Sequence, residues 1–304
     1  FLVISCPCAL VVSIPLGYFG GIGAASRRGI LFKGSNYLDA ITHIDAVVFD
    51  KTGTLTRGVF RVQEVHPFGG LTADELVAWT AAAESGSNHP IARAIGEYAE
   101  QQAIMLPAVR STEERAGLGL RAMTDRGELL VGKAALLAQN QVAFPEDILQ
   151  IPDTIVVVAL DGRYAGYLLL ADEPKPDASR AVTALHALGI RNLCILSGDK
   201  SALVGKLAGQ LGISRYFGDL MPEDKVRHIE EFQTKEHARV AFVGDGLNDA
   251  PVLAASRVGI AMGGLGSDVA IEAADIILQT DQPSKIAEAI RIGRRTRAVV
   301  WQNI

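Results

Sequence analysis

The chain has 304 residues, of which 49% are hydrophobic, and its formal net charge is −5. This length is enough for two modest domains with buried cores. The acidic balance excludes nucleic acid as the main partner, because binding to a phosphate backbone requires clustered excess cations. The three cysteines, Cys6, Cys8 and Cys194, are too few and too unevenly spaced for a disulfide framework.

The first segment of the chain is uncharged. Residues 1–26 contain no acidic or basic side chain, and a run of this length can cross a bilayer. Arg27, Arg28 and Lys33 follow it. We therefore expect residues 1–27 to be a partial transmembrane helix. The alternative is a buried helical hairpin of a soluble protein.

The other end has the reverse order of charge. Four arginines between 291 and 297 precede a short apolar run that ends at Trp301. Basic residues beside an apolar run with Trp are typical of the cytoplasmic side of a membrane helix. We expect residues 288–304 to be a basic lead-in to a further transmembrane helix, with the polar middle of the chain in the cytoplasm. A solvated basic helix face is the alternative.

Short apolar runs that lead into polar segments recur along the middle of the chain. They occupy residues 46–49, 193–196, 240–243, 258–261 and 276–278. Helical patterns separate them at 176–188, 201–211 and 222–234. This alternation predicts an α/β domain with a parallel sheet that is covered on both faces. Ligands of such sheets bind beyond the carboxyl ends of the strands.

The intervening part, residues 58–164, has a different pattern. It contains helical stretches around 73–83 and 90–102, and hairpin-like pieces at 119–131 and 154–170. We interpret it as a second, α+β domain that is inserted into the first. The first domain is then split between residues 28–57 and 165–287.

The polar residues after the apolar runs predict a phosphoryl-transfer site. Asp50, at the end of the first run, is the candidate nucleophile. A carboxylate attacks a terminal phosphate only when charge repulsion is neutralised by a cation and fixed positive groups. Asp245 and Asp249 can serve a Mg²⁺ site, which favours hard oxygen ligands. Lys225 can neutralise the phosphoryl oxygens, and Ser197 can donate a hydroxyl hydrogen bond.

Two long motifs carry a resemblance to a known family. The run Asp-Lys-Thr-Gly-Thr-Leu-Thr at 50–56 resembles the signature of P-type ATPases, and Gly-Asp-Gly-Leu-Asn-Asp-Ala-Pro at 244–251 resembles their hinge motif. Ser-Gly-Asp at 197–199 stands where the family usually has Thr-Gly-Asp. The resemblance implies a haloacid dehalogenase-like, doubly wound parallel sheet with an inserted nucleotide-binding domain. It also implies that Mg²⁺ is held at Asp50, Thr52 and Asp245.

Thr52 is informative for what it lacks. Hydrolytic relatives of this design usually have a second aspartate two residues after the nucleophile, where it acts as general acid and base. This chain has threonine there. We expect an aspartyl phosphate at Asp50 to persist longer without that carboxylate, which suits coupling to a conformational cycle.

The inserted segment resembles the nucleotide-binding domain of heavy-metal-transporting P-type ATPases. Those domains carry a glutamate, then Ser-x-His-Pro, Gly-x-Gly and Gly-Asn. The matching residues, which the resemblance implies bind ATP, are Glu84, His89, Gly117, Gly119 and Gly132. Lys133 stands where asparagine is usual.

Two other nucleotide motifs are rejected. The Gly-x-Gly at 117–119 leads into a predicted hairpin and not into the helix of a dinucleotide site. The P-loop-like run at 127–134 ends in alanine where the Mg²⁺-binding hydroxyl belongs.

Cys6-Pro7-Cys8 lies within the uncharged first segment. Proline opens a helix, and broken backbone in a membrane is tolerated where it lines a protected cavity. Two thiolates beside the break suit soft or borderline cations such as Cu(I), Zn(II), Cd(II) and Pb(II), although cysteine is also a common packing residue. The motif resembles the transport site of the heavy-metal branch. Residues 9–15 and 34–38 are more similar to zinc, cadmium and lead exporters than to copper exporters.

The resemblance implies an integral protein of a plasma or bacterial inner membrane that exports Zn²⁺, Cd²⁺ or Pb²⁺ at the expense of ATP. Its implied partners include the remaining transmembrane helices and an actuator domain, whose Thr-Gly-Glu-type run does not occur in this sequence. A Cu(I)-transporting ATPase is the alternative within the family. A soluble haloacid dehalogenase-like phosphatase is disfavoured by Thr52 and by the uncharged first segment. A non-transporting metal-binding membrane protein is disfavoured by the intact motifs.

Overall fold

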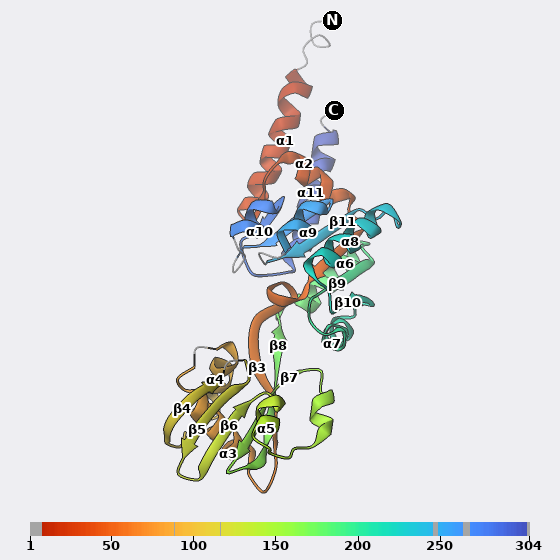
Figure 1. Ribbon diagram of the computed structural model, residues 1–304. Helices are drawn as coiled ribbons and strands as arrows, with labels where there is room; N and C mark the ends of the chain where they lie inside the picture. Colours follow the sequence, from red (N-terminus) through yellow and green to blue (C-terminus); the bar gives the residue numbers. More distant parts are fainter. Residues whose placement is uncertain (1–7, 88, 116, 246–248, 264–267, 303–304) are drawn as a thin grey trace, which may run out of the picture. The chain divides into compact units, whose positions relative to one another are not determined.

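The chain folds into two compact units (Figure 1). A computed structural model describes residues 8–87, 89–115, 117–245, 249–263 and 268–302, with side chains in the first helix described from residue 12. Unit 1 comprises Phe1–Gly58 and Pro174–Ile304, and unit 2 comprises Val59–Glu173. The second unit therefore extends beyond the expected boundary at residue 164. The reason is that residues 163–174 form one uninterrupted strand, which belongs to the sheet of unit 2.

Unit 1 is built on a seven-stranded sheet with the order β1-β13-β12-β11-β2-β9-β10. Its strands are β1 (Ile30–Phe32), β2 (Ala46–Asp50), β9 (Asn192–Leu196), β10 (Arg215–Phe217), β11 (Val240–Gly244), β12 (Val258–Met262) and β13 (Ile276–Leu278). Neighbouring strands are parallel, except that β1 is antiparallel to β13. The sheet confirms the predicted α/β class. Strands β1 and β10 are not among those predicted from the sequence.

Helices cover both faces of this sheet. They are α1 (Cys8–Ser26), α2 (Ser35–Ala40), α6 (Ala178–Ala187), α7 (Ser201–Leu211), α8 (Pro222–Thr234), α9 (Ala250–Ala255), α10 (Asp268–Ala273) and α11 (Lys285–Gln302), with a short turn at Ile41–His43. Side chains alternate across a strand, so Val47 and Phe49 of β2 pack with α6, α7 and α11, while Ala46 and Val48 pack with α8, α9 and α10. Burial on both faces explains why β2 and its neighbours are continuous apolar runs.

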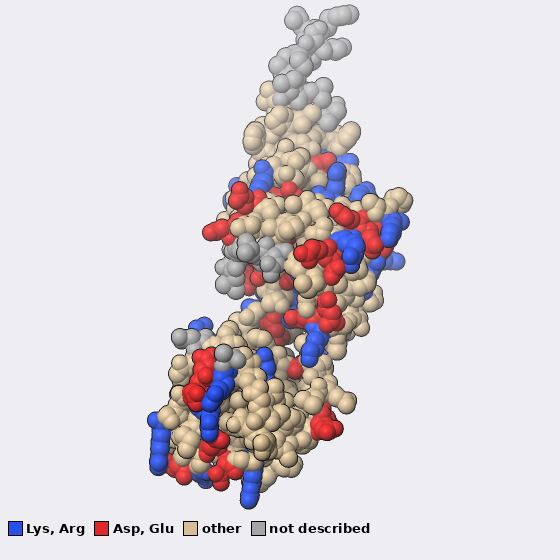
Figure 2. All heavy atoms as spheres, in the orientation of Figure 1, with Lys and Arg blue, Asp and Glu red and all other residues tan. Residues whose placement is uncertain are grey.

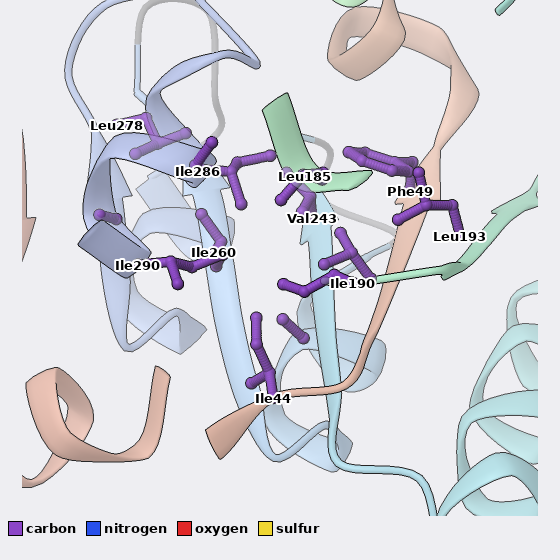
Figure 3. Packing of buried hydrophobic residues seen from close by; sticks show 14 of the residues in the cluster. Ile44, Phe49, Leu185, Ile190, Leu193, Val243, Ile260, Leu278, Ile286 and Ile290 are labelled. Carbon is purple, nitrogen blue, oxygen red and sulfur yellow. The ribbon is translucent and has the colours of Figure 1, made fainter. Parts of the chain in front are cut away.

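The larger core lies between the sheet and α6 and α11. Figure 3 shows Leu185 of α6 and Ile286 of α11 directed toward Val243 and Ile260 of the central strands. All four side chains are fully buried. This packing fixes the ends of β2 and β11, at which the polar residues discussed below begin.

Helix α1 packs along α11. A Cβ atom on Gly17 or Gly21 would overlap Val300 or Thr296 of α11, so the two glycines permit the close approach. On the face shown in Figure 2, the described part of α1 carries no charged side chain. No helix in the described part of the chain combines the length and the hydropathy that a membrane span needs.

Unit 2 is a six-stranded sheet with the order β3-β8-β7-β6-β5-β4. Its elements are β3 (Thr56–Pro67), α3 (Ala73–Glu84), α4 (Pro90–Gln101), β4 (Val109–Arg115), β5 (Gly119–Thr124), β6 (Gly127–Gly132), α5 (Ala134–Gln139), a turn at Glu146–Gln150, β7 (Thr154–Leu160) and β8 (Arg163–Pro174). The hairpins β5–β6 and β7–β8 turn where the sequence predicts. Helices α3 and α4 cover one face, and α5 with the following turn covers the other.

The start of α3 is explained by a capping box. The Thr72 hydroxyl accepts a hydrogen bond from the backbone N–H of Glu75 at 3.2 Å, and the Glu75 carboxylate accepts one from the backbone N–H of Thr72 at 2.9 Å. Two backbone donors that the helix leaves unpaired are thereby satisfied. The cap fixes where α3 begins. All residues of this helix from Leu76 to Ala83 are buried, and Glu84 follows them as its last residue.

Gly119 and Gly132 face each other across the β5–β6 pair. Their φ angles are +138° and +157°, where side chains other than hydrogen are strained. A Cβ atom on Gly119 would overlap the Val131 carbonyl oxygen, and one on Gly132 would overlap the Leu118 carbonyl oxygen. The backbone itself therefore requires glycine at both positions, whether or not a ligand approaches them.

We expect Gly119→Ala and Gly132→Ala each to lower the free energy of unfolding by about 2 kcal/mol or more, because overlap adds to backbone strain. Gly96→Ala is the matched control. Gly96 lies inside α4 with a helical φ and open space at its Cβ, so alanine there should stabilise the chain by about 0.5–1 kcal/mol. Urea unfolding followed by the fluorescence of Trp79, which is buried in α3, measures both effects. Equal stability of the Gly119→Ala variant and the unmodified chain would contradict the packing argument.

Candidate active site

The candidate nucleophile lies at the carboxyl edge of the parallel sheet. Strand β2 ends at Asp50, and its neighbour β11 ends one residue before Asp245. Phe49 is paired with Val243, and Asp50 is paired with Leu196, the last residue of β9, so Ser197 also begins at this edge. The chain crosses from β2 to β9 on one side and returns to β11 on the other. This is the switch point at which parallel sheets bind ligands.

Lys225 connects two of the predicted carboxylates. Its Nζ lies 2.5 Å from Oδ1 of Asp50 and donates a hydrogen bond of 2.9 Å to Oδ1 of Asp249. Lys225, Asp50 and Asp249 are 8%, 6% and 2% exposed, so these charges are shielded from water. Lys225 enters from α8, three residues after Pro222 begins that helix. The structure thus brings together the candidate nucleophile and a cation that are distant in the sequence.

The carboxylates form a cluster with uncompensated negative charge. One oxygen each of Asp50, Asp245 and Asp249 lies within 4.8 Å of the others. Burial, together with the Asp249 carboxylate, raises the pKa of Asp50 to about 7, although Lys225 opposes the shift. Burial also raises the pKa of Asp245 to about 6, with Asp249 adding to the effect. Burial alone would lower the pKa of Lys225, but the two carboxylates that it contacts outweigh this and raise it.

This donor set fits Mg²⁺. The cluster offers carboxylate oxygens, which are the ligands that hard divalent cations prefer. When all four interacting carboxylates are ionised, two lysines among the described residues oppose them, which leaves two negative charges for a divalent ion to neutralise. The groups are Asp50, Asp245, Asp249 and Asp281 against Lys175 and Lys225.

The loop after Asp50 is shaped to admit the Asp245 carboxylate. Gly53 has a φ of +72°, and a Cβ atom there would overlap that carboxylate. Thr52 precedes it with an extended backbone and an exposed side chain. The Thr54 hydroxyl is fully buried, yet it has no hydrogen-bond partner among the described residues. Such unpaired groups are uncommon outside functional sites.

Two ion pairs at this edge were absent from the sequence-based prediction. Lys51 Nζ lies 2.6 Å from Oδ2 of Asp199. The Lys175 ammonium donates to the Gly53 carbonyl oxygen and, at 2.6 Å, to Oδ1 of Asp281. Lys51 and Asp199 lie inside motifs that the sequence analysis used, so their adjacency could have been inferred. Lys175 lies between two prolines with no periodic pattern around it, and only the fold reveals its place.

Ser197 is buried beside this cluster. Its hydroxyl accepts a hydrogen bond from the backbone N–H of Asp199 at 3.2 Å, and its own N–H donates to the Phe217 carbonyl oxygen at 3.0 Å. With 3% of its surface exposed, Ser197 is held in a fixed position at the end of β9.

The candidate nucleotide residues of unit 2 come from two segments. Glu84 ends α3, and His89 precedes α4, where its Nδ1 accepts a hydrogen bond from the Ile91 N–H at 3.2 Å. Burial raises the pKa of Glu84 to about 7; a hydrogen bond from Ser87 opposes the shift, and Glu114 of β4 adds to it. The His89 interaction is a helix cap, so the structure provides a local role for this residue besides the predicted one.

The glycines belong to the second segment. Gly117 lies before β5 with a φ of +74° and open space at its Cβ. Gly119 and Gly132 pack against each other, and the Lys133 N–H donates to the Leu118 carbonyl oxygen at 2.8 Å. Glu114, which acts on Glu84, lies in β4 directly beside β5. The two segments therefore approach each other at this edge of unit 2.

The predicted transport cysteines are not tested by the structure. Cys6 lies outside the described residues, and for Cys8 only the backbone is described. Cys194 is buried in β9, and burial raises the pKa of its thiol to about 12. A thiol with so high a pKa is a poor metal ligand, which agrees with its interpretation as a core residue.

Comparison with known sequences identifies relatives over the whole chain. Residues 44–257 match the haloacid dehalogenase-like hydrolase family. A cadmium, zinc and cobalt-transporting ATPase of Bacillus subtilis is 52% identical over 100% of this chain and 43% of its own length. A zinc-transporting ATPase of Synechocystis is 50% identical over 100% of this chain and 42% of its own. A probable copper-exporting P-type ATPase V of Mycobacterium tuberculosis is 38% identical over 100% of this chain and 40% of its own.

Solved structures agree with these relatives. A zinc-transporting PIB-type ATPase has a TM-score of 0.88 and 37% identity, over 99% of this chain and 49% of its own. The catalytic domain of the CPx-ATPase CopB-B has a TM-score of 0.70 and 32% identity, over 89% of this chain and 98% of its own. The chain spans less than half the length of the curated relatives it matches. It belongs to the haloacid dehalogenase-like hydrolases and, within them, to the heavy-metal P-type ATPases.

Proposed function

We propose that this chain is the catalytic part of an integral membrane ATPase that exports Zn²⁺, Cd²⁺ or Pb²⁺ through an aspartyl phosphate at Asp50. The observation that carries the proposal is the buried contact of Lys225 with Asp50 and Asp249 at the switch point of the sheet. A nucleophile of this kind needs neighbouring positive charge, and a buried lysine provides it without a proton transfer.

The phosphoryl step follows from the positions of the side chains. An oxygen of Asp50 attacks the γ-phosphorus of ATP, the bond from that phosphorus to the bridging oxygen breaks, and ADP leaves with the electron pair. Lys225 lies beside the nucleophile, where its charge offsets the negative charge of the arriving phosphate. Ser197, held at the end of β9, donates its hydroxyl to a phosphoryl oxygen. Hydrolysis of the acyl phosphate then returns the Asp50 carboxylate.

The same cluster would hold Mg²⁺ at Asp50 and Asp245, with Thr52 contributing to the site. When bound, the ion supplies charge neutralisation for the transferred phosphoryl group. Gly53 keeps space for the Asp245 carboxylate, and Asp249 is held by Lys225. The deficit of positive charge in the cluster supports a divalent ion at this place.

ATP is proposed to bind to unit 2 at Glu84, His89 and the Gly117–Gly119 loop. A half-buried carboxyl with a pKa near 7 is suited to accept or donate a hydrogen bond to a base. Gly117 has open space at its Cβ, so a ligand can approach its backbone. Gly119 and Gly132 contribute by holding the shape of that loop, because their own contacts are with each other.

The choice of metal rests on the relatives and on thiolate chemistry. Two of the relatives are named for cadmium or zinc transport, and another for copper. A copper-exporting ATPase is therefore the second candidate. Cys6 and Cys8 are proposed as ligands of the transported ion, since soft and borderline cations prefer thiolates. The partners in the complete protein are the lipid bilayer, the further membrane helices and the actuator domain, with the catalytic units in the cytoplasm.

The nucleophile is tested by incubating the complete protein with γ-labelled ATP. We expect acid-stable, hydroxylamine-sensitive labelling that Asp50→Asn abolishes, because the amide lacks the nucleophilic charge. Asp45→Asn is the matched control: Asp45 precedes the same strand at its far end, where it accepts a hydrogen bond from the Arg239 N–H at 2.7 Å. Labelling should be unchanged in this control. Undiminished labelling of Asp50→Asn would refute the mechanism.

The transported ion is tested through ATPase stimulation. We expect Zn²⁺, Cd²⁺ and Pb²⁺ to stimulate ATP hydrolysis by the complete protein, and Cys6→Ala or Cys8→Ala to remove the stimulation. Cys194→Ala should retain it, because that thiol is buried in β9. Stimulation by Cu⁺ alone would instead favour the copper transporter.

The environment of Glu84 predicts that the difference in stability between the Glu84→Gln variant and the unmodified chain depends on pH. Its pKa is raised in the folded chain from 4.5 to about 7, so the folded state binds more protons than the unfolded state in this window. Stability from this group is present below pH 4.5 and is lost as the pH rises through 7. Glu84→Gln cannot ionise and avoids the loss. Allowing for partial exposure, we expect it to be more stable than the unmodified chain by about 1–2 kcal/mol at pH 8 and equally stable at about pH 4.

Urea unfolding between these pH values, followed by Trp79 fluorescence, measures the difference. Glu75→Gln is the control in the same helix. Hydrogen bonds from Thr72 lower the pKa of Glu75, so this substitution should destabilise the chain at neutral pH. Parallel pH profiles for Glu84→Gln and the unmodified chain would exclude a raised pKa at Glu84.

A further inference from the structure

Lys175 is the most deeply buried lysine side chain among the ion pairs of the described residues, with 2% of its surface exposed. Burying an ammonium costs free energy unless it is paired and hydrogen-bonded. Lys175 meets both conditions, since it donates to the Gly53 carbonyl oxygen and pairs with Asp281 at 2.6 Å. Its backbone N–H also donates to the Leu55 carbonyl oxygen at 2.8 Å. Two of its contacts therefore fall on the loop that follows Asp50.

That loop has little regular structure to hold it. Within Lys51–Leu55, Thr52 is extended and Gly53 has a positive φ, so the backbone is not helical at these two residues. The Thr56 N–H donates to the Lys51 carbonyl oxygen across the loop. The Gly53 Cα packs directly against the Asp245 carboxylate. The carbonyl oxygen of Gly53 is bound by Lys175. A shift of this peptide would move the loop relative to both Asp50 and Asp245.

The other end of the contact lies in a different part of the fold. Asp281 follows β13 and precedes α11, and its carboxylate is partly exposed. Lys175 thus ties the loop after the nucleophile to the segment that begins α11. Lys225 binds the nucleophile itself from α8. The two lysines approach the acidic cluster from different elements and touch different groups.

We propose that Lys175 is a positioning residue for phosphoryl transfer: paired with Asp281, it holds the Gly53 peptide so that Asp50 and the Asp245 carboxylate stay in reacting geometry. This inference rests on the proposed phosphorylation of Asp50. It assigns no contact between Lys175 and the phosphate. Its effect is carried by the loop backbone, and displacement of a reacting group by about 1 Å can lower a rate by about 100-fold.

The test is the single-turnover rate of labelling of the complete protein at saturating ATP and Mg²⁺. We expect Lys175→Met to lower this rate by about 100-fold while the affinity for ATP changes less than about twofold, because unit 2 is untouched. Asp281→Asn should have a smaller effect, since Lys175 keeps its bond to the Gly53 carbonyl oxygen and an amide oxygen replaces the carboxylate oxygen as its second acceptor. Lys285→Met is the matched control and should label normally; Lys285 lies in the first turn of α11 and pairs with Glu288 at 2.8 Å.

The single variant leaves Asp281 without its cation, which can unfold the chain. The double variant Lys175→Met/Asp281→Asn removes both charges, and thermal unfolding and circular dichroism check that it is folded. A folded double variant should still label slowly. A folded double variant or a Lys175→Met variant that labels at the normal rate overturns the inference.

Dependence on Mg²⁺ separates positioning from a simple charge effect. If Lys175 contributed only charge, its removal would lower the Mg²⁺ concentration needed for half-maximal labelling and restore the normal rate at saturation; this outcome also overturns the inference. A low rate that persists at saturating Mg²⁺ supports it. The proposed function fails separately, when the unmodified protein is not labelled or Asp50→Asn is labelled normally.

Discussion

The crowding of carboxylates at one buried edge of the sheet is the constraint on which the rest of unit 1 depends. Burial penalises the charged form of each carboxyl, and repulsion from Asp249 adds to that cost, so the pKa values of Asp50 and Asp245 are raised. Lys225 relieves it on the side of the nucleophile and Lys175 on the side of the loop. Lys225 is held there by α8, which also buries Ile229 and Phe232. Lys175 is held by its backbone N–H, which donates to the Leu55 carbonyl oxygen. The residual negative charge suits a divalent cation.

The sheet meets this constraint through its order of strands. Parallel neighbours end at the same edge, and the return of the chain from β10 to β11 places Asp245 beside Asp50 although the two are far apart in the sequence. Apolar side chains on both faces of β2 pack under helices, which leaves the strand little freedom to move. A rigid strand end is needed to hold the Asp50 carboxylate, whose acidic neighbours would otherwise repel it. The core in Figure 3, which includes Phe49 and Val243, therefore helps to fix the strand end that carries Asp50.

The sequence predicts elements that show a regular apolar pattern, and it predicts the residues at which such a pattern ends. The central buried strands of unit 1, the residues that follow them, and the hairpins β5–β6 and β7–β8 of unit 2 could be located because apolar runs and turn residues mark them. Lys175 could not, because its role depends on a carbonyl oxygen and a carboxylate that only folding brings near it. The end of unit 2 was misplaced because β8 continues as one strand past residue 164. For Gly119 and Gly132, the sequence motif suggests ligand binding. The structure shows that a side chain at either position would overlap a backbone carbonyl oxygen, and this steric reason for glycine cannot be read from the sequence.

The residue at position 52 affects how long the proposed aspartyl phosphate at Asp50 would persist. The Thr52 side chain is exposed, so the loop has room for a larger residue, and steric exclusion does not explain why no carboxylate is present there. A fifth carboxylate beside four interacting ones would add repulsion to a cluster in which Asp50 already has a raised pKa. It would also supply the general base that speeds attack of water on an acyl phosphate. Threonine avoids both effects. The phosphate proposed at Asp50 would then persist long enough to act on the loop that Lys175 ties to α11.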